Sequence, residues 1–354
     1  MIKIHDINTS DVTVRKIGPS TYTSLKNGCK YSYFLTHTRT KEPGTILPCH
    51  NSTLLGTVIH ALFEERAKGM IQNEDDFERR WEAKLTEKEN EIKQMYGLKD
   101  FSMKDYDRMY LAMGTAMNMR AGNVGHSVPG LPSTRVESEK PYETDNLIGT
   151  IDRIENTDGK VKIIDFKTGH IINEATGNIK EEYVAQLNLY ASMFVEKENM
   201  PVDSLEIMDT SGNTFPVPMW SDAQLKSTLK DIDDLISLMN STASKESLAA
   251  VSDKCGMCSA KMICEPYWRG LHKEEKDDED PESVFSDLEI NVTGIENEDV
   301  ISYSEGRITG ASKFTFRFTI GARYRIRGLI YKGDDYEFGK LYLVCSHTII
   351  MKLV

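Results

Sequence analysis

The sequence predicts an α/β protein in which a mixed central sheet is flanked by helices, followed by a small all-β domain. Three patterns lead to this prediction. Apolar residues recur at helical spacing through much of residues 54–120, and strand-like alternation begins near Arg135. After a return to helical patterns, the chain becomes rich in strands again from about residue 285. Such an order is typical of a layered domain with a separate β unit behind it.

The size and composition of the chain set the broad class. Its 354 residues are enough for two domains, and its content of 39% hydrophobic and 28% charged residues is typical of a globular protein. No run of about 18 apolar residues is present, so we expect no membrane span. The segment Met1–Asp6 lacks the apolar core of a secretory signal. We therefore expect a cytoplasmic protein.

The net charge of −12 disfavours nucleic acid as a partner, but the charge is unevenly distributed. The stretch His272–Glu282 holds seven acidic residues and two lysines, and so contributes five of the twelve negative charges. We interpret residues 272–284 as an acidic linker. The linker divides the chain into a first domain at 1–271 and a second at 285–354. A basic groove elsewhere is therefore compatible with the acidic total.

Helices are predicted at residues 54–70, 75–97 and 101–120. In the first of them His60 and Glu64 are four residues apart and share a face. In the last, methionines recur every four residues, a pattern that is typical of core packing: Met109, Met113 and Met117. These segments are expected to flank the central sheet.

Strands are predicted next, at residues 134–142, 147–155 and 160–167. Asp158-Gly159, between the last two, is typical of a tight hairpin. A helix at 180–196 and a strand at 204–208 follow. Ser221-Asp222-Ala223-Gln224 matches a capping box, so we expect a long helix to begin there.

The strand that ends at Lys167 carries candidate catalytic residues. Side chains two residues apart on a strand point the same way, so Asp165 and Lys167 are expected on one side, with Phe166 turned into the core. The hairpin can bring Asp152 of the neighbouring strand close to Asp165. Two carboxylates form a hard oxygen site suited to Mg²⁺ or Mn²⁺, and the lysine can orient or deprotonate a water. These groups suit the hydrolysis of a phosphodiester.

The surroundings of this triplet favour a site over an ordinary solvated strand. Asp-x-Lys alone is common in strands of no special function. Here Gly149-x-x-Asp152 precedes it by one hairpin, and the following helix carries Gln186 and Tyr190 four residues apart, on a face shared with Tyr183. A glutamine on that face can hold water or a phosphate group.

Four cysteines predict a metal site that joins distant parts of the chain. Cys255, Cys258 and Cys264 form a C-x2-C-x5-C cluster, and Cys29 lies far upstream. Four thiolates suit either an iron–sulfur cluster or zinc, and their spacing does not separate the two. Such a site would close a long loop and restrict the unfolded chain. Two further cysteines show no such spacing and are expected to be ordinary small residues: Cys49 and Cys345.

Taken in order, these elements resemble the PD-(D/E)XK nuclease superfamily and, within it, the RecB-like branch. The series consists of Gly56-x-x-x-His60, Glu137, Gly149-Thr150-Ile151-Asp152, Asp165-Phe166-Lys167-Thr168-Gly169 and Gln186-x-x-x-Tyr190. The resemblance covers roughly residues 15–270. It implies a restriction-endonuclease-like core, in which a mixed sheet is flanked by helices, with helical insertions.

The resemblance also implies roles for single residues. The catalytic metal ion would be bound by His60, Asp152, Asp165 and the backbone carbonyl of Phe166. Lys167 would serve the attacking water, while Gln186 and Tyr190 would support the site and contact DNA. Each of these roles belongs to the series as a whole, because each motif is weak when it stands alone.

Two positions of the series are less regular than the others. Glu137 is matched to an acidic position of the site, with Glu139 and Glu143 as near alternatives. His60 on its own would suit a buried helix histidine satisfied by a neighbour, and it is taken as a metal ligand because it stands in series with the other motifs. Ile151 stands where a proline is the usual residue, a change that this branch commonly tolerates.

The cysteine pattern resembles that of AddB-type nucleases and of the CRISPR adaptation nucleases. Those proteins hold a 4Fe–4S cluster, so the resemblance implies such a cluster at Cys29, Cys255, Cys258 and Cys264, with zinc as the alternative. Lys30 departs from the pattern, because relatives often have proline after the first cysteine. The cluster would act as a staple and would shape a surface for single-stranded DNA.

The second domain carries a basic and aromatic stretch. Between Ala311 and Lys332 the chain has six basic residues and no acidic one: Lys313, Arg317, Arg323, Arg325, Arg327 and Lys332. Strand alternation would place Phe314, Phe316 and Phe318 on the face opposite to the charges. An OB-like module would guide single strands by charge and stacking through the first five of these basic residues. A plain barrel, or a docking site for a protein partner, remains open.

We therefore expect a metal-dependent deoxyribonuclease, and more narrowly an exonuclease acting at DNA ends or on single strands in recombination, repair, replication or defence. A helicase or a recombination protein is the expected partner. The alternative is a nuclease-like subunit that binds DNA or a helicase and cuts little. The chain has no G-x4-G-K followed by Ser or Thr, so we do not expect it to unwind DNA with ATP by itself.

Overall fold

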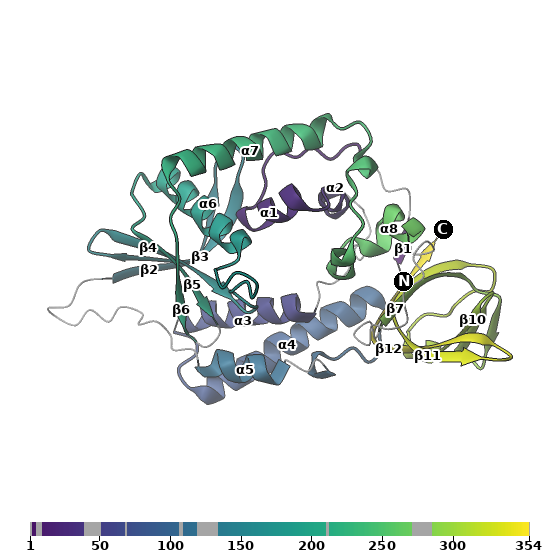
Figure 1. Ribbon diagram of the computed structural model, residues 1–354. Helices are drawn as coiled ribbons and strands as arrows, with labels where there is room; N and C mark the ends of the chain where they lie inside the picture. The colour runs from purple at the N-terminus through teal and green to yellow at the C-terminus, as the bar shows by residue number, and fades with distance from the viewer. Residues whose placement is uncertain are drawn as a thin grey trace.

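The computed structural model describes residues 2–4, 9–38, 51–67, 69–105, 109–118, 134–209, 212–270 and 285–353. Within them the chain forms a helix-flanked sheet followed by a separate β-rich domain, which confirms the predicted fold class (Figure 1). Figure 1 shows the two β units at opposite ends of the molecule, with helices between them. In the described part of the chain, no helix is long and apolar enough to cross a membrane.

The first sheet has five strands and is mixed, as predicted. Its order is β2 (Thr134–Glu143), β3 (Ile148–Thr157), β4 (Lys160–Lys167), β5 (Ser204–Asp209) and β6 (Thr214–Val217). β4 and β5 are parallel, joined by helix α6 (Glu181–Glu198), and the other neighbours are antiparallel. The central strand β4 is mostly buried because neighbours cover both of its edges and helices cover its faces.

The predicted hairpin between β3 and β4 is present. Asp158 has φ 51° and Gly159 has φ 84°, so both turn residues adopt the left-handed conformation that a type I′ turn requires. Asn156 adds a side-chain bond, because its Oδ1 accepts the Gly159 N–H at 3.0 Å. The turn sets the register that brings the ends of β3 and β4 together at the candidate site.

Two groups of helices flank this sheet (Figure 1). The group drawn above it comprises α1 (Pro19–Asn27), α2 (Tyr31–His37), α6 and α7 (Asp222–Ser241). The group drawn below comprises α3 (Asn51–Ala67), α4 (Glu74–Tyr96) and α5 (Met109–Asn118). Ser221 and Gln224 form the predicted capping box at the start of α7.

The helix expected at 101–120 is shorter than predicted. A single turn of 3₁₀ helix occupies Met103–Asp105, and α5 begins at Met109. Glu89 of α4 explains the early turn, because its carboxylate accepts the Met103 N–H at 2.6 Å and thereby holds this segment against α4. The local sequence pattern does not contain that long-range hydrogen bond.

The C-terminal domain is a closed barrel. Its strands run in the order β7 (Phe285–Asn291), β11 (Arg323–Asp335), β12 (Gly339–Leu353), β10 (Gly306–Thr309), β9 (Val300–Tyr303) and β8 (Gly294–Glu296). Since β7 continues into β8 along the chain, the path closes on itself. β10 and β12 are parallel, while the other pairs within the path are antiparallel. With β7 and β8 counted as one interrupted strand, this connectivity is that of a five-stranded Greek-key barrel of the OB type.

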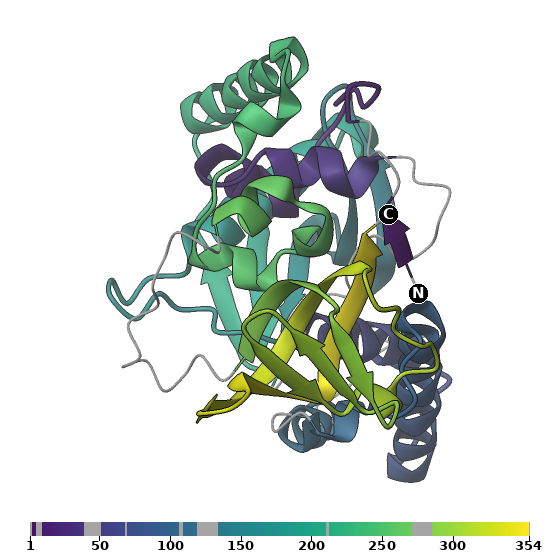
Figure 2. The same cartoon turned by 90° about the vertical axis from the view of Figure 1, so that its right-hand side faces the viewer.

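Two features of the barrel differ from the sequence-based expectation. Strand β1 (Ile2–Ile4) pairs in parallel with the end of β12, so it belongs to the sheet of the barrel (Figure 2). The domain boundaries predicted from the sequence placed this strand in the first domain. Phe314, Phe316 and Phe318 do not lie on a strand. Their rings cluster with Tyr324 instead, at centroid distances of 4.9 to 6.4 Å. Aromatic packing has replaced strand pairing there.

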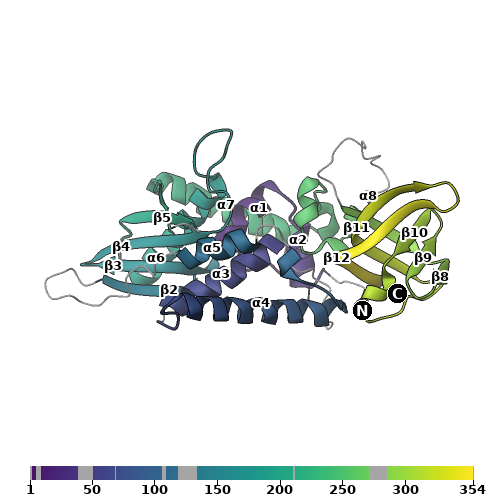
Figure 3. The ribbon, with the colours of Figure 1, turned by 90° about the horizontal axis from the view of Figure 1, so that it is seen from below.

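The barrel contacts the end of α4, which extends toward it (Figure 3). Leu98 and Phe314 form an isolated antiparallel bridge, and the Thr315 N–H donates to the Gly97 carbonyl at 2.9 Å. Gly97 has φ 66°, and a Cβ there would lie 2.9 Å from Thr315 Oγ1. A glycine is therefore needed both to end α4 and to admit the barrel backbone.

Candidate active site

Strands β3 and β4 bring two carboxylates together. Arg153 pairs with Ile164, so Asp152 and Asp165 occupy facing positions in neighbouring strands. Asp165 is 2% exposed, and Asp152 Oδ2 accepts the Phe166 N–H at 2.8 Å. The two strands thus place both acids at the edge of the buried core, where carboxylate charge is poorly solvated.

Helix α3 and strand β2 complete a group of potential metal ligands. His60, Glu139 and Asp152 each offer a ligand atom, and these atoms all lie within 4.8 Å of one another. His60 Nδ1 lies 3.9 Å from Glu139 Oε1 and 3.9 Å from Asp152 Oδ2. His60 is held by the Phe166 ring, which contacts it edge-on with centroids 6.2 Å apart.

The acidic residue from β2 is Glu139, whereas the sequence prediction placed Glu137 at the site. Glu139 lies opposite Asp152, between the pairs Ser138–Arg153 and Lys140–Ile151. Its φ of 50° departs from strand geometry and so reorients the backbone at this position. Glu137 instead forms ion pairs with Arg135 and Lys140, at 2.9 and 2.7 Å. Glu143, the other alternative, pairs with Lys16.

The protonation of these groups reflects burial and crowding of charge. Burial, followed by repulsion from Asp165, raises the pKa of Asp152 to about 7. Burial also raises the pKa of Asp165, although the Lys167 ammonium opposes that change. Burial lowers the pKa of His60, but a hydrogen bond to Glu139 and the nearby carboxylates outweigh it, so the net shift is upward. In the absence of a cation the group therefore holds extra protons near neutral pH.

Lys167 and Gln186 lie on the other side of Asp165. Lys167 Nζ lies 2.6 Å from Asp165 Oδ2 and donates to Gln186 Oε1 at 3.0 Å. Gln186 Nε2 donates to Asp165 Oδ1 at 2.8 Å, which closes the triangle. The ring of Tyr183 lies 5.0 Å from the lysine ammonium. The structure thus brings together the strand and helix residues that the sequence analysis singled out.

Tyr190 fills the space next to the start of β3. It is 6% exposed, and burial followed by the charges of Asp165 and Asp152 raises its pKa. A Cβ on Gly149 would lie 2.9 Å from Tyr190 Cε1 and 3.1 Å from Pro19 Cδ. Gly149 is therefore required by the close approach of α6 and α1 to the sheet.

The donor set fits a hard divalent cation. A histidine nitrogen and carboxylate oxygens converge from α3, β2 and β3, and oxygen-rich sets of this kind suit Mg²⁺ or Mn²⁺. Asp165 Oδ2 is buried next to this group. Among the described residues it has the ion pair to Lys167 but no donor with hydrogen-bond geometry, so it retains lone pairs for a cation. We find the residues compatible with such an ion.

A family model described as the PD-(D/E)XK nuclease superfamily matches residues 18–265. The chain belongs to this superfamily. The match spans the helix-flanked sheet and the cysteine cluster and stops before the barrel. For a PD-(D/E)XK domain, a cation site at the paired acids and a nuclease activity are the general expectations that the fold supports.

Other comparisons add little. A crystal structure from Eubacterium rectale, named a "Putative exonuclease", is similar to this chain with a TM-score of 0.30 and 11% sequence identity. The alignment covers 80% of this chain and 98% of that one, and nothing is inferred from a likeness at this level. A comparison with curated proteins finds no match.

Among the four predicted thiols, Cys264 is buried and the other three are partly exposed. Cys29 follows α1, and the other three belong to the cysteine segment, which we define as residues 253–268. Burial raises the pKa of Cys258 and raises that of Cys264 to about 12, and in both cases the charges of the other thiols of this set add to the shift. The four cysteines are therefore close enough to influence one another. Cys49 lies outside the described residues.

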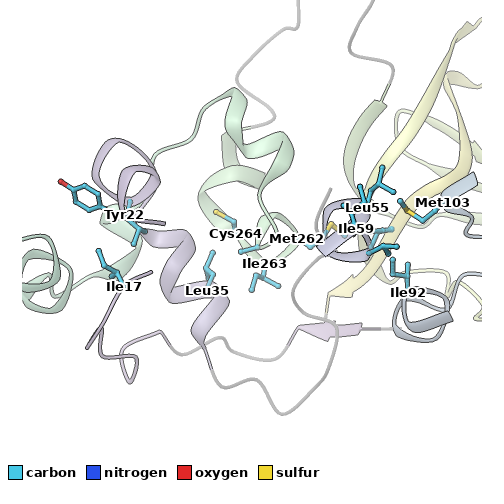
Figure 4. Packing of buried hydrophobic residues seen from close by; sticks show 14 of the residues in the cluster. Ile17, Tyr22, Leu35, Leu55, Ile59, Ile92, Met103, Met262, Ile263 and Cys264 are labelled. Atoms are coloured by element: carbon cyan, nitrogen blue, oxygen red, sulfur yellow. The ribbon is translucent and has the colours of Figure 1, made fainter. Parts of the chain in front are cut away.

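The cysteine segment is anchored to the helical core by apolar side chains (Figure 4). Met262 and Ile263 are buried between cysteines, and Figure 4 shows Ile263 beside Leu35 of α2. Backbone N–H groups point at the sulfur atoms: Ser252 N–H donates to Cys255 Sγ at 3.4 Å. Cys345 lies apart from this set, in β12, where its sulfur donates to the Gly328 carbonyl at 3.2 Å.

Burial removes one member of the predicted nucleic-acid surface of the barrel, Arg325. Arg325 is fully buried, because it binds Glu265, Glu289 and a backbone carbonyl within the protein. Arg323 pairs with Glu289 at 3.0 Å. The remaining three also have partners inside the chain: Lys313 with the Val344 carbonyl, Arg317 with Glu298 and Arg327 with the Gly256 carbonyl. The expectation of free charges on one strand face is wrong for Arg325.

Proposed function

We propose that this chain is a Mg²⁺- or Mn²⁺-dependent deoxyribonuclease of the RecB-like branch, acting as an exonuclease at DNA ends or on single strands. The observation that carries the proposal is the convergence of His60, Glu139 and Asp152 beside the cluster of Lys167 and Gln186. Such a set joins a site for a cation to a cationic side chain that can act on water. A binding-only subunit has no need of that arrangement.

The chain's own residues have distinct tasks in this proposal. His60, Glu139, Asp152 and Asp165 would hold the cation, which would polarise the scissile phosphate and acidify water. Lys167 is restrained by its contacts with Asp165 and Gln186, so its remaining N–H can orient the attacking water or neutralise a phosphate oxygen. The roles assigned to the Phe166 carbonyl and to DNA contacts by Gln186 and Tyr190 remain part of the proposal.

We further propose that Cys29, Cys255, Cys258 and Cys264 hold a 4Fe–4S cluster. Support comes from the mutual influence of these thiols and from the N–H groups directed at sulfur, which stabilise thiolate ligands. Zinc is the alternative. Iron and sulfide analysis of anaerobically purified protein separates the two, because a zinc protein would be colourless and free of sulfide.

The proposed nuclease activity also suggests a substrate and a partner protein. DNA with a free end or in single-stranded form would enter the site, and a helicase or a recombination protein would supply it in the cytoplasm. The sequence has no ATP-binding phosphate loop, so duplex unwinding would be a partner's task. Recombination, repair, replication and defence all use such an activity.

A nuclease assay tests the proposal directly. Protein purified anaerobically is given Mg²⁺ or Mn²⁺ with end-labelled linear single strands or with circular single strands. We expect metal-dependent digestion of the linear substrate alone. In Lys167→Ala the rate should fall by about 100-fold or more, since positioned proton-transfer groups commonly contribute that much. Digestion of circles as well would make the protein an endonuclease.

Lys162→Ala is the matched control. It removes a lysine from the same strand that lies away from the site. The Nζ atom of Lys162 pairs with Glu206 Oε1 at a distance of 2.9 Å. The control should digest DNA at the wild-type rate. Equal activity of Lys167→Ala and Lys162→Ala would refute the catalytic assignment, and the absence of any metal-dependent cutting by the wild type would favour a DNA-binding subunit.

A further inference from the structure

The barrel and the cysteine segment are joined by buried ion pairs. Each of the two contributes a buried cationic side chain that binds a residue of the other. From the cysteine segment, Lys261 forms an ion pair with Asp287 of β7, and both side chains are less than a tenth exposed. From the barrel, Arg325 of β11 reaches the cysteine segment with no exposed surface at all. Charges are buried only where partners replace water, so each side depends on the other.

Arg325 is satisfied along its whole guanidinium group. Its Nε donates to Glu289 within the barrel at 2.8 Å. Its Nη1 donates to the Met262 carbonyl at 2.9 Å, and its Nη2 donates to Glu265 at 2.5 Å. Because Met262 and Glu265 flank Cys264, a rigid planar fork binds the backbone before that thiol and a side-chain carboxylate after it.

Tyr267 links the barrel to the same thiol by a second route. Its hydroxyl donates to Asp287 Oδ2 at 2.7 Å, while its backbone N–H donates to the sulfur of Cys264. The other oxygen of Asp287 accepts the N–H of Gly328 in β11, at 3.1 Å. Asp287 therefore connects two barrel strands to the residue that hydrogen-bonds the sulfur.

A third contact reaches the first two cysteines of the segment. Arg327, two residues after Arg325 on β11, donates from Nη2 to the Gly256 carbonyl at 3.1 Å. Gly256 lies between Cys255 and Cys258 in the chain. The barrel thus holds the cysteine segment between its thiols and after the last of them.

We propose that the C-terminal barrel is a clamp that positions three of the four cysteines, with Arg325 and Asp287 as positioning residues. The proposal rests on the proposed cluster at these cysteines. For Arg325 and Arg327 of β11, the partner is then the cysteine segment of the same chain rather than a phosphate backbone. Hydrogen bonds to sulfur and exclusion of solvent govern the persistence and redox properties of an iron–sulfur cluster, so the barrel would tune it.

The experiment compares two arginines of the same strand in the full-length protein. Arg325→Met removes the buried fork and keeps much of its volume. Arg323→Met is the matched control, because Arg323 is half-exposed and pairs only with Glu289 among these residues. In air with a chelator, loss of the visible cluster absorbance should be at least tenfold faster in Arg325→Met than in the wild type. The control should lose its cluster at the wild-type rate.

Tyr267→Phe adds a readout that a general loss of stability would not produce. It removes the hydroxyl that binds Asp287 but keeps the backbone N–H directed at Cys264. We expect the electron paramagnetic resonance spectrum of the reduced cluster and its reduction potential to change, while thermal unfolding stays close to wild type. Wild-type cluster loss in Arg325→Met together with a wild-type spectrum in Tyr267→Phe would overturn the clamp.

Failure of the cluster proposal is distinguishable from failure of the clamp. If the wild type binds no iron, the cluster is disproved, and hydrogen exchange of residues 253–268 then tests the clamp. Exchange there should be at least tenfold faster in Arg325→Met than in Arg323→Met, and equal exchange would overturn the proposal. If Arg325→Met is insoluble, Glu265→Ala removes the Nη2 contact from a half-exposed side chain and serves in its place.

Discussion

At the scale of residues, the candidate site brings together carboxylates that repel one another unless a cation is present. Asp152 and Asp165 face each other in a poorly solvated position, and Glu139 adds a third carboxylate near them. In the part of the chain that the structure describes, His60 and Lys167 offer positive charge next to these carboxylates. Carboxylates arranged in this way repel one another. A divalent cation would relieve this electrostatic repulsion, and so stabilise the site more than it would stabilise carboxylates on an ordinary surface.

The identity of the β2 ligand leads to a direct test. Glu139→Gln should weaken Mn²⁺ binding at least about tenfold, because it removes one full charge next to the cation, an interaction of more than about 1.4 kcal/mol. Glu137→Gln is the matched control and should bind Mn²⁺ as the wild type does, since Glu137 is engaged with Arg135 and Lys140. Titration calorimetry measures both, and the reverse order would restore Glu137 to the site.

The raised pKa of Asp152 predicts how the metal-free protein responds to pH. Its folded pKa of about 7 exceeds the ordinary value of 3.8, so the folded state binds more protons than the unfolded state between these values. The free energy of unfolding must then fall as pH rises toward 7 and level off above it. The raised pKa of His60 acts in the same direction.

The size of this effect follows from the same shift. Between pH 6 and pH 8 the contribution of Asp152 to the free energy of unfolding falls by about 1 kcal/mol. Urea unfolding in the presence of a chelator measures it, and Asp152→Asn should show a shallower dependence because it cannot titrate. A wild-type protein that gains stability from pH 6 to pH 8, or a variant with an identical slope, would contradict the assignment.

At the scale of elements, local sequence signals determined the scaffold of the site. Asp158-Gly159 makes the β3–β4 hairpin, and the capping box begins α7 where the sequence indicated. The i, i+4 spacing of Gln186 and Tyr190 places both on the inner face of α6, where both are buried. Turn chemistry and helical periodicity depend on neighbouring residues alone, which is why these features could be predicted.

The packing of α6 and α1 against β3 gives a prediction at this scale. Gly149→Ala introduces a Cβ that would lie 2.9 Å from the buried Tyr190 ring. We expect a loss of about 1–3 kcal/mol in the free energy of unfolding, together with reduced nuclease activity, because the ring and the sheet must separate. Gly114→Ala is the control: its Cβ meets nothing within 4 Å in α5, and it should be neutral or slightly stabilising. Similar losses in both variants would argue against the close approach.

At the scale of the whole molecule, the barrel is joined to the first domain at two separate places. One is the end of α4, through Gly97 and Thr315, and the other is the cysteine segment, through Arg325 and Asp287. Two attachments restrict the orientation of the barrel more than a single covalent connection would.

The distribution of charge on the barrel has a consequence for nucleic acid. OB-type barrels commonly bind oligonucleotides through the face of the second and third strands and through two loops, one between the first and second strands and one between the fourth and fifth. Here those loops are acidic: Glu298 and Asp299 lie between β8 and β9, and Asp334, Asp335 and Glu337 lie at the β11–β12 hairpin. Acidic side chains oppose phosphate binding, while Arg325 and Arg327 of β11 bind the cysteine segment. The barrel therefore suits an internal role better than the expected guidance of single strands.

The sequence by itself determined the layers of the fold, the hairpin and the facing positions of Asp152, Asp165 and Lys167, because strand alternation and turn type act over a few residues. Only the tertiary structure decided that Glu139 rather than Glu137 faces His60, since a left-handed φ at one residue breaks the alternation. The burial of Arg325 likewise depends on partners 60 residues away, at Glu265, and no periodic pattern contains such a contact. Local rules therefore specified most of the elements around the site, and long-range packing specified which charges meet.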